Sequence, residues 1–168
     1  LLMPDSLFRQ SMGRMGEGLS AIEKLAELCQ TSLTSTAIRY IQRTELPEAV
    51  ILSAKNLVDF CFMSDALKVL GKGKFDFLRK ETPLPRNSET LNFNNNPLNV
   101  QNSERVTLRV SIQDWFGGNR DIEAEEQIIG LGGYGKTLTI ISVLNIVDEE
   151  ENEDEDDSNW NRRMKRHY

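Results

Sequence analysis

Residues 49–63 read AVILSAKNLVDFCFM, and this stretch decides the fold class. Two apolar runs, 49–53 and 58–63, flank a short polar turn, which is the pattern of a β-hairpin. Because side chains alternate between the two faces of a strand, every second residue of the latter run is expected on one face. Those residues are Val58, Phe60 and Phe62. The hairpin predicts a domain built on antiparallel strands.

Two further segments predict strands, and one predicts a loop. Arg105–Ile112 alternates cleanly between apolar and polar residues, and Thr137–Val147 is rich in β-branched residues. The stretch near 83–104 is rich in Asn and Pro, which predicts a long loop. We therefore expect residues 47–148 to form one α+β domain with an antiparallel sheet. The alternation in Arg105–Ile112 is expected to bury Val106, Leu108, Val110 and Ile112.

Residues 1–46 are predicted to be a small helical module. A capping box at 20–23 opens one helix, a polar break follows at 30–32, and apolar spacing over 33–41 marks a second helix. Two short helices joined by a tight turn give a helix-turn-helix-like arrangement. The second helix would display the candidate residues for contact with a protein substrate or DNA, namely Thr34, Ser35, Arg39, Gln42 and Arg43.

The distribution of charge argues against strong DNA binding and sets apart the C-terminal end. Residues 1–46 carry equal numbers of acidic and basic residues, and phosphate neutralisation supplies much of DNA affinity. Most of the net charge of −6 comes from the acidic run 148–157. We expect residues 149–168 to be a disordered acidic and then basic tail. No stretch is apolar enough to predict a membrane span, and the expected location is the cytoplasm.

The residues needed for metal or nucleophilic chemistry are scarce. The sequence has one histidine, His167, and two cysteines, Cys29 and Cys61. This set cannot build a HExxH motif or a Cys/His zinc cluster, so we predict no catalytic and no metal-binding residue in this chain. Both cysteines are expected to be small core residues.

A glycine-rich stretch imitates a nucleotide-binding loop. Residues 130–137, GLGGYGKT, match the phosphate-binding pattern GxxxxGK[ST]. That loop requires a helix to begin at its lysine, whereas the residues after Lys136 are β-branched and predict a strand. We therefore expect a glycine turn before a strand. Three aromatic residues are candidates for a pocket in this domain, namely Trp115, Phe116 and Tyr134.

Several segments, taken in order, resemble one family. They are LLMP at 1–4, LAELCQTSLTSTAIRY at 25–40, TPLP at 82–85, DWF at 114–116, EE at 125–126 and GLGGYGKTLTII at 130–141. Together they resemble the C-terminal, non-catalytic part of the ImmA/IrrE-type zinc metallopeptidases. The apolar run before Pro4 is expected to be the last turn of a helix that begins upstream of Leu1. The Asn-rich stretch and the charged tail have no counterpart in the family pattern.

The resemblance implies a zinc peptidase domain upstream, a helix-turn-helix-like module over 1–46 and a GAF-like domain over 47–148. Such proteins cleave helix-turn-helix repressors in mobile-element and stress responses. The Zn²⁺ ion and its HExxH ligands would all precede Leu1. This chain would therefore be the regulatory and substrate-positioning part of a metallopeptidase. Two alternatives remain open: a stand-alone DNA-binding or ligand-sensing module, and a nucleotide-hydrolysing enzyme.

Overall fold

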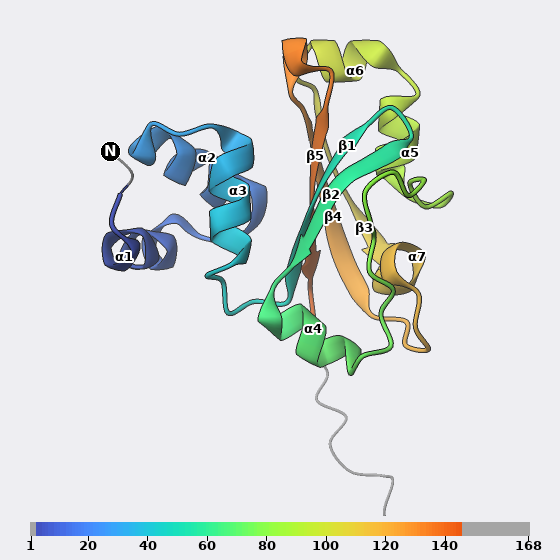
Figure 1. The fold of residues 1–168 in the computed structure, drawn as a ribbon, viewed down its shortest axis with the longest axis horizontal. Helices are drawn as coiled ribbons and strands as arrows, with labels where there is room; N and C mark the ends of the chain where they lie inside the picture. Colours follow the sequence, from blue (N-terminus) through green and yellow to red (C-terminus); the bar gives the residue numbers. More distant parts are fainter. Residues whose placement is uncertain (1–2, 146–168) are drawn as a thin grey trace, which may run out of the picture.

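The computed structural model describes residues 3–145 and is built around one antiparallel sheet (Figure 1). The strand order is β2-β1-β5-β4-β3. The strands are β1 (Glu48–Ala54), β2 (Leu57–Met63), β3 (Arg105–Ser111), β4 (Glu123–Gly130) and β5 (Thr137–Val143). The helices are α1 (Asp5–Met15), α2 (Gly18–Cys29), α3 (Leu33–Ile41), α4 (Asp65–Gly71), α5 (Glu89–Asn94), α6 (Pro97–Gln101), α7 (Ile112–Phe116) and the 3₁₀ turn η1 (Gly132–Tyr134). The α+β prediction with an antiparallel sheet is confirmed.

Helices cover both faces of the sheet, and each face has its own hydrophobic core. On one face α1, α2 and α3 contribute Phe8, Ile22, Leu25, Ala37, Tyr40 and Ile41, which pack against Val50, Leu52, Ile129, Leu138 and Ile140 of the sheet. The opposite face packs against α4, α7 and the segment that follows α4, and this core includes Leu67, Leu78, Leu84, Ile112, Trp115 and Phe116. The helical module therefore shares a core with the sheet.

The β1–β2 hairpin forms as predicted but contains an irregularity. Leu52 pairs with Phe60 and Ser53 pairs with Val58, so Asp59 is an extra residue without a partner in the register. A bulge of this kind reverses the alternation of side chains along the strand. The prediction that Val58 shares a face with Phe60 is therefore wrong: Val58 lies in the core on the α7 side, while Phe60 packs against the core beneath the helices.

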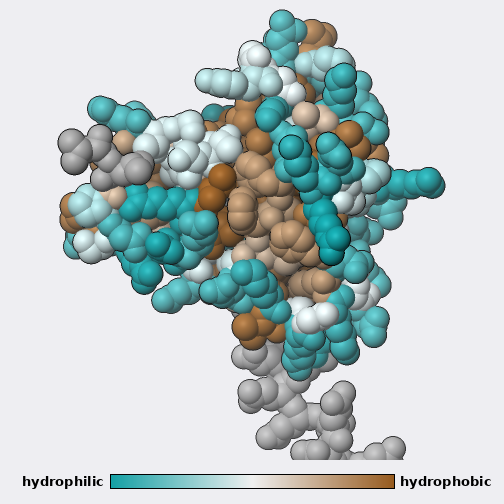
Figure 2. All heavy atoms as spheres, viewed as in Figure 1, coloured by the Kyte–Doolittle hydropathy of each residue, from teal (hydrophilic) through white to brown (hydrophobic). Residues whose placement is uncertain are grey.

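The bulge leaves aromatic side chains at the surface of the β2 edge. The Phe60 and Phe62 rings lie 5.3 Å apart between centroids, and Phe62 is partly exposed. Figure 2 shows hydrophobic residues gathered in the middle of this face, over β1 and β2 beside the helical layer. The hairpin thus completes one core and extends apolar surface beyond it.

The helical module follows the predicted helices, with one boundary moved. Helix α2 begins at Gly18, with Glu17 as its N-cap residue and no side-chain cap, so the predicted capping box at Ser20 is wrong. The cap for α3 comes from the polar break, where the Ser32 side chain accepts a hydrogen bond from the Ser35 amide. Gln30 adopts a left-handed conformation that ends α2. The turn is therefore closed from both sides, by the left-handed Gln30 at the end of α2 and by the Ser32 cap at the start of α3.

The expected long loop near 83–104 is wrong over half of its length, because α5 and α6 form within it. The side chain of Ser88 caps α5, and that of Asn96 caps α6. Pro97 occupies the first turn of α6, where its missing N–H costs nothing. Asparagine and proline act here as helix-start signals rather than as loop residues.

The predicted alternation is confirmed in β3, with lower burial than expected, but the strand ends at Ser111 and the buried Ile112 begins α7. Val106, Leu108 and Val110 are half-buried, whereas Thr107 and Arg109 are exposed. β3 is an edge strand, so one side of each apolar residue remains open. Strand β5 lies between β1 and β4, and five of its residues are buried. None of the helices in residues 3–145 combines the length and the apolar character that crossing a bilayer requires.

Candidate functional site at the helix pair

The residues predicted to contact a substrate or DNA lie on α3 and just beyond its end. Ser35 and Gln42 are exposed, and Thr34 is half-buried. The two arginines, Arg39 and Arg43, are the only charged members of this set. Both point toward α1, so the helix does not present them freely to solvent.

Arg39 joins the start of the described chain to the helix pair. Its guanidinium donates to the carbonyl oxygen of Met3 at 2.7 Å and lies 4.2 Å from the centroid of the Phe8 ring. The Asp5 carboxylate is 3.6 Å away. A cation over an aromatic face, with a carbonyl and a carboxylate beside it, forms a clamp with contacts on three sides. This Arg39 clamp fixes α1 and the residue before Pro4 against α3.

Asp5 is shared by three arginines. Its carboxylate accepts from Arg43 Nε at 2.9 Å and lies 3.4 Å from Arg9 Nε and 3.6 Å from Arg39. The hydrogen bond from Arg43 is the largest of the effects that hold the pKa of Asp5 below its ordinary value. One carboxylate cannot neutralise three guanidinium groups, so positive charge remains around this end of α1.

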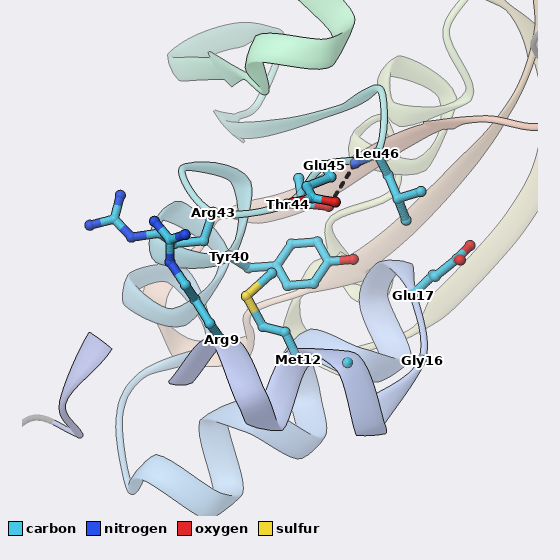
Figure 3. A pocket seen from close by; sticks show the side chains of 10 residues that line it. Arg9, Met12, Gly16, Glu17, Tyr40, Arg43, Thr44, Glu45 and Leu46 are labelled. Atoms are coloured by element: carbon cyan, nitrogen blue, oxygen red, sulfur yellow. Dashed lines mark hydrogen bonds between the residues drawn. The ribbon is translucent and has the colours of Figure 1, made fainter. Parts of the chain in front are cut away.

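A cleft of about 450 Å³ lies between α1, the end of α3 and the linker to β1 (Figure 3). Arg9 and Arg43 lie together at one end, Glu17 lies at the other, and Met12 and the Tyr40 ring lie between them. The linker residues Thr44, Glu45 and Leu46 form the remaining wall. The volume is within the roughly 300–1,000 Å³ typical of ligand sites. The cleft therefore has a cationic end, an apolar floor and an anionic end.

A buried carboxylate lies directly behind this cleft. Glu48 is 1% exposed and accepts hydrogen bonds from the Ser142 hydroxyl at 2.9 Å and the Thr44 hydroxyl at 3.2 Å. Burial raises the pKa of Glu48, and burial together with the nearby Glu48 raises the pKa of Tyr40. Thr44 and Tyr40 thus belong both to the cleft wall and to a polar network that reaches β5.

The three candidate pocket aromatics do not come together. Trp115 and Phe116 are buried in the core beside α7, whereas Tyr134 is 85% exposed on η1. Helix α7 adjoins the Glu123 end of β4, and η1 follows the Gly130 end, so the full length of that strand separates them. The two buried rings pack 6.3 Å apart and serve the core.

No family model and no curated protein matches this chain.

The glycine-rich stretch is a turn before β5, as expected. Lys136 Nζ lies 2.6 Å from Asp59 Oδ2, so its charge is engaged by the bulged residue of β2. A Cβ atom on Gly130 would meet backbone atoms of α6 at 2.6–2.7 Å, which explains a glycine at that position. Gly130 and Lys136 therefore have structural roles that require no phosphate.

The described residues do not fit a zinc site. Residues 3–145 contain no histidine, and no group of three potential metal-ligating side chains occurs among them. Cys29 packs against the core beneath the helices and Cys61 lies in the opposite core, so the sheet separates the two thiols. His167 lies outside the described residues. Any zinc ligands of the kind that the family resemblance implies would have to come from elsewhere.

No role was predicted for Glu126, although it belongs to the EE pair at 125–126. Its carboxylate is fully buried and accepts from the Thr90 amide at 2.8 Å, the Thr90 hydroxyl at 2.6 Å and Trp115 Nε1 at 3.1 Å. The amide belongs to the first turn of α5, where backbone donors lack helical partners. Glu126 therefore ties α5 and α7 to β4. An acidic residue at a buried position of a strand was the available signal.

Proposed function

We propose that this chain is the regulatory and substrate-positioning part of an ImmA/IrrE-type zinc metallopeptidase that cleaves a helix-turn-helix repressor. Within this proposal residues 1–46 are the helix-turn-helix-like module and residues 47–148 are the GAF-like domain. The zinc and the catalytic residues belong to a domain upstream of Leu1. The Arg39 clamp is the observation that carries the proposal.

The Arg39 clamp binds a segment that carries the family resemblance. Met3 and Pro4 belong to the LLMP segment that closes the zinc-site helix in the family, and Arg39 binds the Met3 carbonyl at 2.7 Å. The sulfur atoms of Cys29 and Met3 are 3.8 Å apart, which adds a contact from α2. An upstream domain would therefore be joined to the helix pair through ordered contacts. A rigid connection between the upstream domain and the helix pair would set the distance and angle between the catalytic site and a docked substrate.

The same contacts weigh against the DNA-binding alternative. Arg39 and Arg43 are both occupied by Asp5 and the α1 segment. A recognition helix needs free side chains at the groove and positive charge near the phosphates. The cleft at α1 favours the ligand-sensing alternative over the DNA-binding one, because it is a concave site next to a buried polar network.

The proposal is tested in two steps. The DNA upstream of the codon for Leu1 is sequenced in frame, and an open frame that encodes HExxH supports the assignment. The complete protein is then incubated with repressors encoded beside its gene, and cleavage is followed by gel and mass spectrometry. A stop codon or an unrelated upstream sequence would overturn the proposal.

Two variants, one in the Arg39 clamp and one outside it, test the role of the clamp. Arg39→Gln in the complete protein is expected to lower the cleavage rate about tenfold or more, while zinc content stays unchanged, because the docked segment is misplaced relative to the zinc. Arg14→Gln is the control, since Arg14 is exposed on α1 and makes no described ion pair. Equal rates for the two variants would contradict a positioning role.

A further inference from the structure

The cleft between α1 and the linker carries separated charges that its own residues do not neutralise. At the cationic end, Arg9 and Arg43 share the Asp5 carboxylate with Arg39. The Arg9 side chain is 63% exposed, and it stays available to a ligand because its contact with Asp5 is long, at 3.4 Å. This end therefore attracts a carboxylate group.

The opposite end attracts a cation. Glu17 follows the end of α1, and Glu45 lies in the linker wall next to Thr44. Neither carboxylate forms an ion pair with any residue in the range 3–145. Glu48 lies behind them, and the charge of Glu17 contributes to the raised pKa of Glu48. No basic residue lines this end of the cleft.

The length of the cleft indicates the size of its ligand. Arg9 and Glu17 lie at the two ends of the cleft, and α1 runs six residues, or about 9 Å along its axis, from Arg9 to its last residue just before Gly16 and Glu17. A free amino acid places its two charges much closer together than this. An extended peptide advances about 3.3 Å per residue, so charged groups two or three residues apart span the cleft. Met12 and the Tyr40 ring offer an apolar floor for the residue between them.

We infer that this cleft binds a peptide about three residues long, with a negative group at one end, an apolar middle and a positive group at the other end. The carboxylate lies against the exposed Arg9, beside the Arg43 guanidinium that Asp5 already binds, and the cation lies against Glu17. The inference rests on the proposed function for the natural source of the peptide, which is then a segment of the cleaved repressor. The cleft chemistry itself is a property of this chain.

Three probe peptides test the charge pattern by isothermal titration calorimetry at low salt with the full chain. Acetyl-Asp-Leu-Lys-amide carries the charges on side chains, as a protein segment does. Unblocked Ala-Leu-Ala carries them on its termini, as a free peptide does. Acetyl-Asn-Leu-Gln-amide has the same length without charge. Binding of either charged probe, with at least fivefold weaker binding of the uncharged one, supports the inference and identifies the source.

Variants locate the binding within the cleft. Arg9→Gln and Glu17→Gln are each expected to weaken the charged probe two- to fivefold, the range of an exposed ion pair. Arg14→Gln and Glu27→Gln are matched controls on α1 and α2 outside the cleft, and they are expected to leave affinity unchanged. Asp5→Asn is expected to tighten binding, because it releases the arginines from their internal partner.

The outcomes separate the inference from the proposed function. Absence of binding by both charged probes to the folded chain, or equal effects of cleft and control variants, would overturn the peptide site. Circular dichroism of each variant establishes that it is folded. Neither result bears on the presence of an upstream HExxH, which is tested by the reading frame. A reading frame without that motif would remove the proposed function and leave the measured peptide binding intact.

Discussion

Deletion of the Glu126 side chain is the most demanding test of how α5 and α7 are held to β4. In Glu126→Ala, the fully buried Thr90 amide and Trp115 Nε1 lose their acceptor, whereas the Thr90 hydroxyl can turn to Thr139 Oγ1 at 2.7 Å. The Glu89 amide, 3.4 Å from the same carboxylate, is only part-buried and adds little to the cost. Each orphaned buried donor costs about 1–3 kcal/mol. Two such donors give an expected loss of about 4 kcal/mol in the free energy of unfolding. This is a large part of the total stability of a domain.

The assay is urea unfolding followed by circular dichroism, with a double-mutant cycle. Trp115→Phe removes one donor and leaves the carboxylate bound to Thr90, so about 1–2 kcal/mol is expected. In the double variant the indole is no longer orphaned, and the two losses should sum to more than the measured value by about 1 kcal/mol. Glu125→Ala, half-buried on the neighbouring position of β4, should cost about 0.5 kcal/mol or less. A loss below 1 kcal/mol for Glu126→Ala would refute the reasoning.

Three further predictions concern single sites. Burial raises the pKa of Glu48, so the folded state holds the Glu48 proton to a higher pH than the unfolded state does. Stability should therefore fall as the pH rises above about 4.5, and Tm measured against pH should fall less steeply in Glu48→Gln. Burial raises the pKa of Cys61 to about 12, so an alkylating reagent should label the half-buried Cys29 first and Cys61 only on unfolding; mass spectrometry that finds both labelled together would disprove this. Gly130→Ala should lower stability by about 2 kcal/mol because its Cβ would meet the backbone of α6, whereas Gly133→Ala, which has open space, should change Tm little; equal shifts would argue against the close approach.

The parts of the fold that depend on local pattern were predictable from the sequence. Alternation identified β3, two apolar runs identified the β1–β2 hairpin, and helical spacing identified α2 and α3. The β-branched run after Lys136 correctly favoured a strand over the helix of a nucleotide site. In each case neighbouring residues determine the structure, so a short window of sequence contains the information.

The features that were missed depend on contacts between distant residues. The bulge at Asp59 reverses a face and leaves no mark in a pattern of alternation. The segment of helix α5 was predicted to be part of a loop, yet its first turn is bound by Glu126, 36 residues further along the chain. The cleft requires Asp5 and Arg43, which are 38 residues apart, to meet. The sequence shows that these segments are charged but not that they lie next to one another in the fold.

Strand β1 has a consequence for how the chain can be divided. Val50 and Leu52 serve the core beneath α1–α3, while Ala49 and Ile51 serve the core on the other side. A fragment that starts at residue 47 would present the bare faces of β1 and β5 to water, and such apolar strands associate with one another. We therefore expect the helical module to prevent association between exposed sheet faces. Shortened forms of the chain for crystallisation or binding assays should retain it.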